Sequence, residues 1–385
     1  MAAERLYDKD SHCAEFTATV ISCEAVKDGY AVILNRTAFY PEGGGQSGDT
    51  GMLDDARVLD TYERDGEVVH LCENALEPSS SVSGRIDWQR RLDLMQQHSG
   101  EHIVSGIIHR RFGYDNVGFH MGAEFVTIDF NGMLDLEQLA EVEREANEFI
   151  WKNVSVETLL PSEEERKNID YRSKKELTGT VRIVKIEGAD VCACCGTHVK
   201  NTGEIGLVKL LSCQKFHDGV RIEMLCGRKA LAYLSAVCEQ NRGISALLSA
   251  PPVQTAQAVE RLLAETAQMK LRVTALERRL TASRIEAMRD GGDILLFERD
   301  LSADALRELA DGCAQVCGGR AAIFCGSDEE GYKYILAQKG GDLRETAKAL
   351  NAALCGRGGG KPEFVQGSVQ SSRDAIEAFF KAGEQ

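Results

Sequence analysis

Short apolar runs separated by turn signals occupy the first part of the chain. The runs rich in β-branched residues predict strands: Phe16–Ile21, Tyr30–Leu34, Val68–Leu71 and Val82–Ile86. Asp65-Gly66 and the Pro78-to-Ser81 stretch supply turns between them. Several short strands at this spacing predict a small β-barrel over residues 1–87.

The pattern becomes helical from Trp88 to about Phe112, where apolar residues recur at spacings of three and four. Strand-like runs and one further helix, from Leu136 to about Lys152, follow it. The expected strands are Gly118–Met121, Phe125–Phe130, Val181–Ile186, Ile205–Cys213 and Val220–Leu225. This mixture predicts an α+β core over residues 88–235.

Residues 236–290 predict a helical linker. From Val259 to Ala287, apolar positions alternate spacings of three and four, which is a heptad seam. Such a seam serves either an intramolecular helical hairpin or the coiled coil of a homodimer. From residue 291 to 385 the order strand, helix, strand, strand, helix predicts a C-terminal α/β domain, a second place where two copies could pair.

Composition restricts the functional classes. The net charge of −15 argues against binding nucleic acid through overall charge. Three local basic clusters remain candidates for binding nucleic acid, namely Arg85/Arg90/Arg91, Lys174/Lys175/Arg182/Lys185 and Arg357/Lys361. No apolar stretch resembles a signal peptide or a membrane span, and the 13 cysteines are not expected to form a disulfide framework. We therefore expect a cytoplasmic protein that does not enter membranes.

Two pairs of metal-ligand residues give the strongest chemical signal. His98 and His102 stand four residues apart on a predicted helix, and Cys194 and His198 have the same spacing. Residues four apart share one face of a helix, so the two imidazoles can bind one ion. Nitrogen and sulfur ligands in this number suit one Zn²⁺ per chain. Cys192 or Cys195 remains an alternative to Cys194.

A rival interpretation comes from Glu101. The order His98-x-x-Glu101-His102 also matches the H-x-x-E-H pattern of zinc metallopeptidases, in which the glutamate is the base. Glu101 and His120 are the candidate proton-transfer groups near the metal. The downstream Cys/His loop makes the peptidase less favoured, because the usual third ligand of such enzymes is acidic, although residues 163–165, all glutamate, could supply one.

One glycine-rich segment precedes the metal motifs in the sequence and another follows them. Phe39–Gly51 contains three consecutive glycines, which permit positive φ and close approach of another group. The second, Gly356–Gly367, is expected to be a loop whose backbone amides, with Arg357 and Lys361, offer a phosphate-binding surface.

Taken in order, these motifs resemble the alanyl-tRNA editing proteins, in particular their long form. The family is related to the editing and C-terminal domains of alanyl-tRNA synthetase, and the latter is shared with DHH-type phosphoesterases (DHHA1). The matching segments are Phe39–Gly51, His98–His102, Cys194–Val199, Thr202–Gly206, Gly219–Glu223 and Gly356–Gly367. Cys195 departs from a common glycine and Glu101 from a common small residue or glutamine.

The resemblance implies a hydrolase that deacylates misacylated tRNA(Ala), carrying serine and in some cases glycine, with one zinc ion. It implies that His120 lies near the aminoacyl group and leaves the role of Glu101 open. The implied substrate pocket comprises Gly43, Gly44, Gly45, Gln46 and Thr197. The implied tRNA-binding residues are Arg357, Gly358, Gly359, Gly360 and Lys361. Besides the metallopeptidase, a noncatalytic tRNA-binding module with a structural zinc is the remaining alternative.

Overall fold

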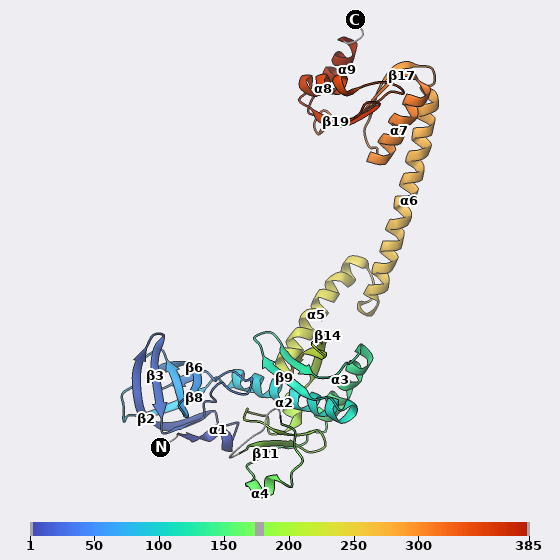
Figure 1. Cartoon of the computed structure of the whole chain (residues 1–385). Coiled ribbons are helices and arrows are strands. Elements are labelled where there is room, and N and C mark those ends of the chain that lie inside the picture. The colour runs from blue at the N-terminus through green and yellow to red at the C-terminus, as the bar shows by residue number, and fades with distance from the viewer. Residues whose placement is uncertain (1–2, 174–180, 383–385) are drawn as a thin grey trace. The chain divides into compact units, whose positions relative to one another are not determined.

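The computed structural model describes residues 3–173 and 181–382 (Figure 1). The chain divides into two compact units, Met1–Asn241 and Arg242–Gln385. Lys174 and Lys175 of the predicted basic cluster lie outside the described residues. Helices and sheets occur in both units, so the mixed α+β class is confirmed.

Six strands near the N-terminus close on themselves as a barrel, in the order β2-β3-β7-β6-β5-β8. Their bounds are Glu15–Val26, Gly29–Leu34, Glu67–Cys72, Ala56–Arg64, Gly51–Leu53 and Ser81–Ile86. In β8 every second residue is buried, as expected for a strand with one face on a core. A short strand, β1 (Glu4–Arg5), and a one-turn helix, α1 (Leu6–Lys9), precede the barrel, and β1 pairs with β4 (Arg36–Thr37).

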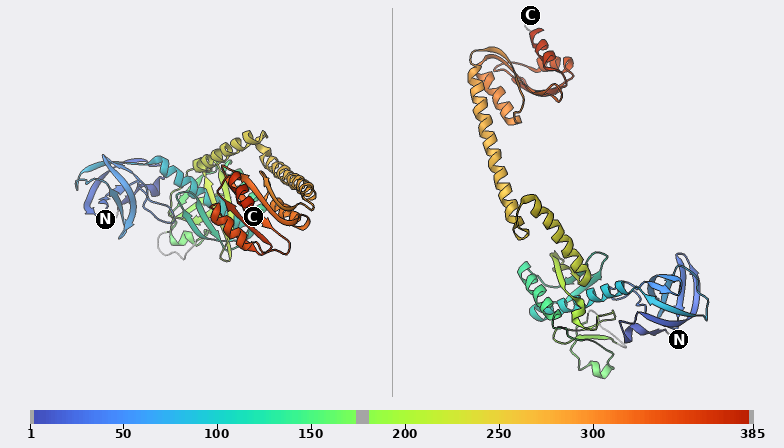
Figure 2. Two further views of the ribbon diagram at one scale, coloured as in Figure 1. Left: turned by 90° about the horizontal axis from the view of Figure 1, so that it is seen from above. Right: turned by 180° about the vertical axis from the view of Figure 1, so that it is seen from behind.

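Helix α2 (Trp88–Phe112) leaves the barrel directly after β8 and enters the α+β core, as both views of Figure 2 show. The Asp87 side chain accepts a hydrogen bond from Arg90 N and caps its start. Gly113, at φ 71°, ends it in the left-handed conformation that glycine adopts readily. Polar as well as apolar side chains of α2 are buried, because other elements surround the helix.

The core around α2 contains two antiparallel sheets. The larger has the order β14-β15-β10-β9, with bounds Val208–Phe216, Gly219–Cys226, Val126–Phe130 and Asn116–Met121. The smaller comprises β11 (Val156–Leu159), β12 (Ile183–Ile186) and β13 (Asp190–Ala193). Helix α3 (Leu136–Ile150), with a capping box, and the short helix α4 (Glu163–Arg166) complete it.

The sequence pattern was wrong in several details of this core. It did not predict β11 or β13, and the buried positions of β13 are Asp190 and Cys192, polar or weakly apolar residues. The strand predicted from Ile205 begins at Val208, because Thr202–Ile205 forms the 3₁₀ helix η1. Asn201 and Glu204 cap that turn reciprocally.

Helix α5 (Gly227–Leu248) is followed by the 3₁₀ helix η2 (Pro252–Gln254) and by α6 (Thr255–Ala287). Most apolar side chains of the predicted seam on α6 are exposed: Val259, Leu262, Met269, Val273, Leu276 and Leu280. Pairing through this seam stays a prediction. Among the described residues, no helix combines the length and apolarity needed to span a membrane.

In the second unit a five-stranded sheet has the order β16-β17-β18-β20-β19. The bounds are Gly292–Glu298, Gly318–Ser327, Gly331–Ala337, Phe364–Val369 and Arg357–Lys361. Helices α7 (Ala303–Val316), α8 (Arg344–Ala353) and α9 (Arg373–Ala382) accompany it, and α7 lies along α6 in Figures 1 and 2.

The expectation of a glycine-rich loop after α8 is wrong, because residues 357–361 form the edge strand β19 paired with β20. A Cβ on Gly358 would lie 2.5 Å from the Gln366 carbonyl oxygen and 2.6 Å from the Tyr334 hydroxyl. Glycine therefore permits this strand to pack closely against its neighbour.

Candidate metal centre

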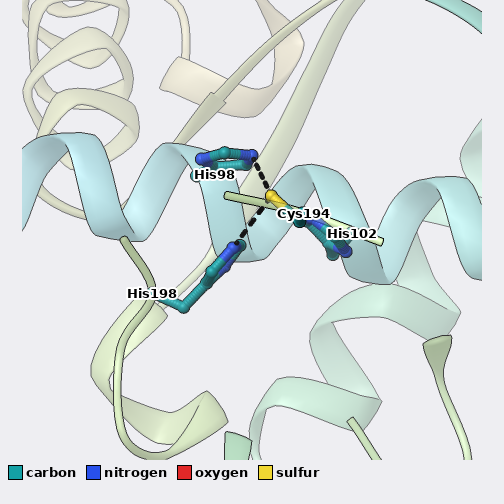
Figure 3. Close-up of side chains that lie close together, drawn as sticks. All are labelled: His98, His102, Cys194 and His198. Atoms are coloured by element: carbon teal, nitrogen blue, oxygen red, sulfur yellow. Dashed lines mark hydrogen bonds between the residues drawn. The ribbon is translucent and has the colours of Figure 1, made fainter. Parts of the chain in front are cut away.

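Four side chains predicted as ligands come together in the first unit. His98 and His102 project from α2, and Cys194 and His198 project from the loop after β13 (Figure 3). One ligand atom from each lies within 4.8 Å of all the others. The Cys194 Sγ atom is 3.3 Å from His98 Nε2 and 3.4 Å from His198 Nε2.

These separations fit a tetrahedral ion. Zinc–sulfur and zinc–nitrogen bonds of about 2.3 and 2.0–2.1 Å give a sulfur-to-nitrogen edge of about 3.6 Å. The two edges to Cys194 Sγ, 3.3 and 3.4 Å, are close to that value. Three imidazoles and one thiol also match the ligand preference of Zn²⁺. The donor set and these two edges therefore fit zinc.

Each imidazole is oriented by a hydrogen bond at its other nitrogen. His102 Nδ1 lies 2.7 Å from Asp190 Oδ2, His98 Nδ1 lies 3.0 Å from Gln46 Oε1, and His198 Nδ1 lies 3.1 Å from Ser99 Oγ. With Nδ1 occupied in all three rings, Nε2 is the nitrogen available to a metal. Such outer partners are a regular feature of metal sites.

The Asp190 carboxylate carries the most extensive of these contacts. Arg172 donates to it from Nε at 2.7 Å and from Nη2 at 2.9 Å. Burial alone would raise the pKa of Asp190, but hydrogen bonds and charge from His102 and Arg172 lower it below its ordinary value. The carboxylate therefore stays ionised and holds the His102 ring.

The protonation states of Cys194 and His198 are compatible with metal binding. Burial would raise the pKa of the Cys194 thiol, but the His98 and His198 imidazoles hold it well below the ordinary value, which favours the thiolate. Burial lowers the pKa of His198 to about 3, which keeps that ring neutral. A thiolate and a neutral imidazole are the forms that bind zinc.

The other two cysteines of the motif lie outside this four-residue cluster. Cys192 is buried and forms a second group with His102 and Asp190, and burial raises the pKa of its thiol. The Cys195 residue as a whole is exposed. Partial desolvation of its thiol, and then the charge of Cys194, raise the pKa of that thiol. The geometry therefore favours Cys194 as the cysteine ligand.

The loop that carries Cys194 is fixed by Arg182, which the sequence indicated only as part of a basic cluster. Arg182 Nη1 donates to the carbonyl oxygens of Cys194 at 3.0 Å and Gly196 at 2.7 Å. The backbone of Arg182 also accepts a hydrogen bond from Cys194 N. A Cβ on Gly196 would lie 2.1 Å from His98 Cε1, so only glycine fits there.

The glycine motif reaches the metal cluster through Gln46. This residue is fully buried, and its Oε1 atom accepts from His98 Nδ1 and Thr197 N, while Nε2 donates to Thr197 Oγ1. Gln46 and Thr197 thus connect the barrel loop to the metal loop. Gly45 contacts strand β9, because its carbonyl accepts from Met121 N. Gly44 and Gly45 form a tight turn between Gly43 and Gln46, which pair with each other.

Neither candidate proton-transfer group is a member of the four-residue cluster. The Glu101 carboxylate is buried and accepts hydrogen bonds from Ser105 Oγ at 2.6 Å and from Asn116 Nδ2. His120 lies on strand β9 with an exposed side chain.

Phe119 is a neighbour of the site that the sequence pattern did not indicate. Its ring stacks on His98 with centroids 4.9 Å apart, and a Cβ on Gly45 would lie 2.8 Å from Phe119 Cδ1. Phe119 thus separates the His98 ring from the glycine turn. Its place beside His120 in the Gly118–Gly122 segment was the available signal.

The predicted tRNA-binding residues lie elsewhere in the chain. Arg357, Gly358, Gly359, Gly360 and Lys361 make up strand β19, in which every residue is exposed. They belong to the second unit.

Comparison with protein families assigns three segments. Residues 10–90 match class II tRNA synthetases (A), residues 181–223 match the second additional domain of threonyl and alanyl tRNA synthetases, and residues 290–385 match the DHHA1 domain. The second segment contains both loop ligands, Cys194 and His198. The third covers the five-stranded sheet.

Curated relatives match along nearly the whole chain. The alanyl-tRNA editing protein AlaX-L of Pyrococcus horikoshii is 30% identical over 97% of this chain and 96% of its own length. The alanyl-tRNA editing protein Aarsd1 of Mus musculus is 28% identical over 97% of this chain and 96% of its own. The alanine–tRNA ligase of Ignicoccus hospitalis is 30% identical over 98% of this chain but 42% of the ligase. The resemblance drawn from the motifs is thereby confirmed, and the chain belongs to the family of alanyl-tRNA editing proteins.

Proposed function

We propose that this protein is a trans-editing hydrolase that deacylates misacylated tRNA(Ala), with Ser-tRNA(Ala) and Gly-tRNA(Ala) as substrates. The observation that carries the proposal is the cluster of His98, His102, Cys194 and His198, in a chain that matches editing proteins end to end. Such an activity has a physical reason. A pocket built for alanine rejects glycine, or a small residue with an added hydroxyl, only weakly, so a second hydrolytic site is needed.

One Zn²⁺ per chain would be held by these four residues, with Nε2 as the donor of each imidazole. When bound, zinc would supply Lewis acidity to the ester and its attacking water. Cys194 is the only member of the set that is not fully buried, so the accessible side of the cluster lies there. Asp190, Gln46 and Ser99 would hold the rings in place.

The remaining residues position the substrate. Gly43, Gly44 and Gly45 would line the substrate's approach to the metal cluster. Gln46 and Thr197 would hold the wall of the substrate pocket in place through the hydrogen bonds between them. His120 is exposed on β9 and is our candidate for proton transfer near the aminoacyl group. Because an aminoacyl ester is labile, holding a water in place would suffice without a covalent nucleophile.

Glu101 would stabilise the fold around α2 and would not act as the catalytic base. A peptidase base must face the metal-bound substrate, whereas the Glu101 carboxylate is buried against Ser105 and Asn116. That contact pattern disfavours the H-x-x-E-H metallopeptidase. The noncatalytic alternative keeps one supporting observation: four protein ligands can close a zinc site and make it structural.

The second unit would bind tRNA(Ala). Arg357 and Lys361 flank an exposed glycine strand, and cations of this kind bind phosphate without reading bases. The proposed setting is the cytoplasm. A homodimer through residues 259–287, or through the C-terminal domain, is proposed on the exposed seam of α6.

The test is a deacylation assay with Ser-, Gly- and Ala-tRNA(Ala), run with untreated protein, with chelator-treated protein and with chelator-treated protein given zinc again. We expect hydrolysis of the two misacylated species, little hydrolysis of Ala-tRNA(Ala), and recovery on adding zinc. Binding of tRNA without turnover would instead support the noncatalytic module. Cleavage of peptides without deacylation would support the peptidase.

A further inference from the structure

The chain just before the barrel lies against the chain that follows the metal loop. Side chains from residues 10–12 contact residues 198–204, and the second of these segments begins with the metal ligand His198. The contact to the ligand itself comes from Ser11, whose hydroxyl donates to the His198 carbonyl oxygen at 2.7 Å. The sequence gave no sign of this contact, because the two residues lie 187 positions apart.

The Ser11 hydrogen bond completes the attachment of one peptide unit. The amide that follows His198, Val199 N, donates to Ser99 Oγ at 3.2 Å. The C=O and N–H groups of a trans peptide point in opposite directions, so Ser11 and Ser99 hold this unit from two sides. The Ser99 oxygen also lies 3.1 Å from His198 Nδ1. Because rotation of the peptide changes the direction of the His198 side chain, its attachment limits where the imidazole can point.

Ser11 is itself held through its backbone and its side chain. Its carbonyl oxygen accepts from Arg91 Nη1 at 2.8 Å, and Arg91 is a fully buried residue of α2. The Ser11 hydroxyl oxygen lies 3.2 Å from His12 Nδ1. A hydroxyl has one hydrogen and two lone pairs, so Ser11 can donate to the His198 carbonyl while its oxygen contacts the His12 ring.

The His12 ring is held in turn by two other elements. Its Nε2 atom lies 2.7 Å from Glu204 Oε2, in the 3₁₀ helix η1. Its ring packs on Trp88, the first residue of α2, with centroids 5.2 Å apart. The other Glu204 oxygen accepts from the backbone amides of Lys200 and Asn201. His12 therefore joins the start of α2 to the chain that follows the metal loop.

An ion pair between Asp10 and Lys200 adds a third contact between the two segments. Lys200 Nζ lies 2.9 Å from Asp10 Oδ1, and the same oxygen accepts from His12 N at 2.9 Å. The side chains of Asp10 and Lys200 are 49% and 53% exposed, and exposed ion pairs contribute little to stability. The contact that reaches the ligand is therefore the one from Ser11.

The metal loop is held at both ends by hydrogen bonds to its backbone carbonyls. Arg182 Nη1 donates to the carbonyl of Cys194, the first ligand of the loop, and Ser11 donates to that of His198, the last. Figure 3 shows the His198 ring turned toward the Cys194 sulfur, from which Nε2 lies 3.4 Å away. A metal site requires its ligands within about 0.5 Å of the binding geometry, so a loop end that turned would weaken the site.

We propose that Ser11, oriented by His12, is a positioning residue for the metal ligand His198. The inference rests on the proposed zinc centre and extends it to the N-terminal segment, which no ligand motif includes. Ser11 acts through the peptide that carries the ligand, and not on the metal or the substrate. Loss of its hydroxyl removes one of the two attachments of that peptide.

Variants of the full-length protein test this role. Ser11→Ala removes the hydroxyl, whereas Ser11→Thr keeps it. Ser80→Ala is the matched control, because the Ser80 hydroxyl donates to the Glu77 carbonyl at the same distance, 2.7 Å, in the turn before β8. His12→Phe keeps a ring against Trp88 and removes the hydrogen bonds of the imidazole.

Competition with a chromophoric chelator measures the zinc affinity of each protein. The visible absorption of Co²⁺ bound in place of zinc reports the geometry of the ligands, which a loss of general stability does not change. Unfolding of the zinc-free proteins shows that each variant folds. Deacylation of Ser-tRNA(Ala) at saturating zinc is measured in parallel.

We expect Ser11→Ala to lower the zinc affinity about three- to tenfold, as for the loss of one hydrogen bond, and to alter the Co²⁺ spectrum. His12→Phe should act in the same direction by about two- to threefold, because the hydroxyl remains but loses its orienting partner. Ser11→Thr and Ser80→Ala should match the wild type in both measurements.

Three results would overturn the proposal: wild-type zinc affinity and Co²⁺ spectrum in Ser11→Ala, an equal loss in Ser11→Thr, or an equal loss in Ser80→Ala. Unchanged affinity in His12→Phe would overturn the part assigned to His12. A wild-type protein that binds neither Zn²⁺ nor Co²⁺ would refute the metal centre and the positioning role together. The expected loss of zinc affinity in a protein that does not deacylate Ser-tRNA(Ala) would uphold the positioning role and refute the hydrolase.

Discussion

The outer partner of His102 offers the sharpest test of the metal centre. Asp190→Asn keeps the size of the side chain but removes the charge that faces His102 Nδ1 at 2.7 Å and Arg172 Nε at 2.7 Å. An amide can still accept from the imidazole, so the ring keeps an approximate position. The change therefore isolates the charge of the carboxylate from its shape.

The expected loss of zinc affinity in Asp190→Asn can be estimated from the contacts of the carboxylate. Outer hydrogen-bond partners of metal-bound histidines are worth about 10–100-fold in metal affinity, equivalent to ~1.4–2.7 kcal/mol. Asp190 should lie toward the upper end, because its side chain is 2% exposed and its carboxylate holds both His102 and Arg172. The same neighbours keep the carboxylate ionised, so the charge is present at neutral pH.

Competition with a chromophoric zinc chelator, at fixed pH and salt, measures this loss directly. Asp129→Asn is the matched control, because Asp129 also receives two hydrogen bonds from one arginine, Arg221, at 2.7 Å each. That pair bridges β10 and β15 and contributes no atom to the ligand cluster. Unchanged zinc affinity in a folded Asp190→Asn protein, or an equal loss in Asp129→Asn, would refute the reasoning.

Four further outcomes are expected. Cys194→Ala should lose most of its zinc in metal analysis, and full stoichiometry would exclude it as a ligand. Glu101→Gln should retain zinc and lower deacylation by less than about tenfold, whereas loss of several orders of magnitude would restore the peptidase base. Burial lowers the pKa of His70 to about 4. As the pH falls, the unfolded chain therefore takes up the proton before the folded protein does. The contribution of His70 to the free energy of unfolding should be constant above about pH 6.5 and fall by roughly 3 kcal/mol toward pH 4. Denaturant titrations of His70→Gln should show a shallower pH dependence, and an unchanged slope would exclude this histidine. Removal of residues after Asn241 should weaken tRNA binding and its salt dependence but leave zinc bound, and unchanged affinity would place the tRNA surface on the first unit.

The ligands themselves were predictable from sequence because their geometry is local. Two residues four apart on a helix share a face whatever surrounds them, so His98 and His102 could be paired before any fold was known. The same spacing pointed to Cys194 rather than to its neighbours. The heptad pattern likewise predicted a long helix, and α6 extends from Thr255 to Ala287.

The orienting residues were not predictable, because they come from separate elements. Asp190 begins strand β13, Ser99 lies on α2 and Gln46 belongs to the glycine turn. Spacing along the chain says nothing of such contacts. Gln46 was expected to line the substrate pocket, but all of its side-chain polar atoms are engaged with His98 and Thr197. Glycine content similarly predicted a loop at residues 357–361, where pairing with β20 makes a strand.

The barrel and the metal core function as one body, although the sequence suggested a boundary at residue 87. Helix α2 carries Arg91, which is fully buried and bonded to Asp49 in the glycine motif and to the carbonyls of Ser11 and Ala38. Both side chains of the Arg91–Asp49 ion pair are almost completely buried. Removing either one would leave an uncompensated buried charge and lower the free energy of unfolding by about 3–5 kcal/mol. The pair fixes the motif that delivers Gln46 to His98. The glycine motif of residues 39–51 is therefore part of the metal site, because its Gln46 side chain orients the His98 ring.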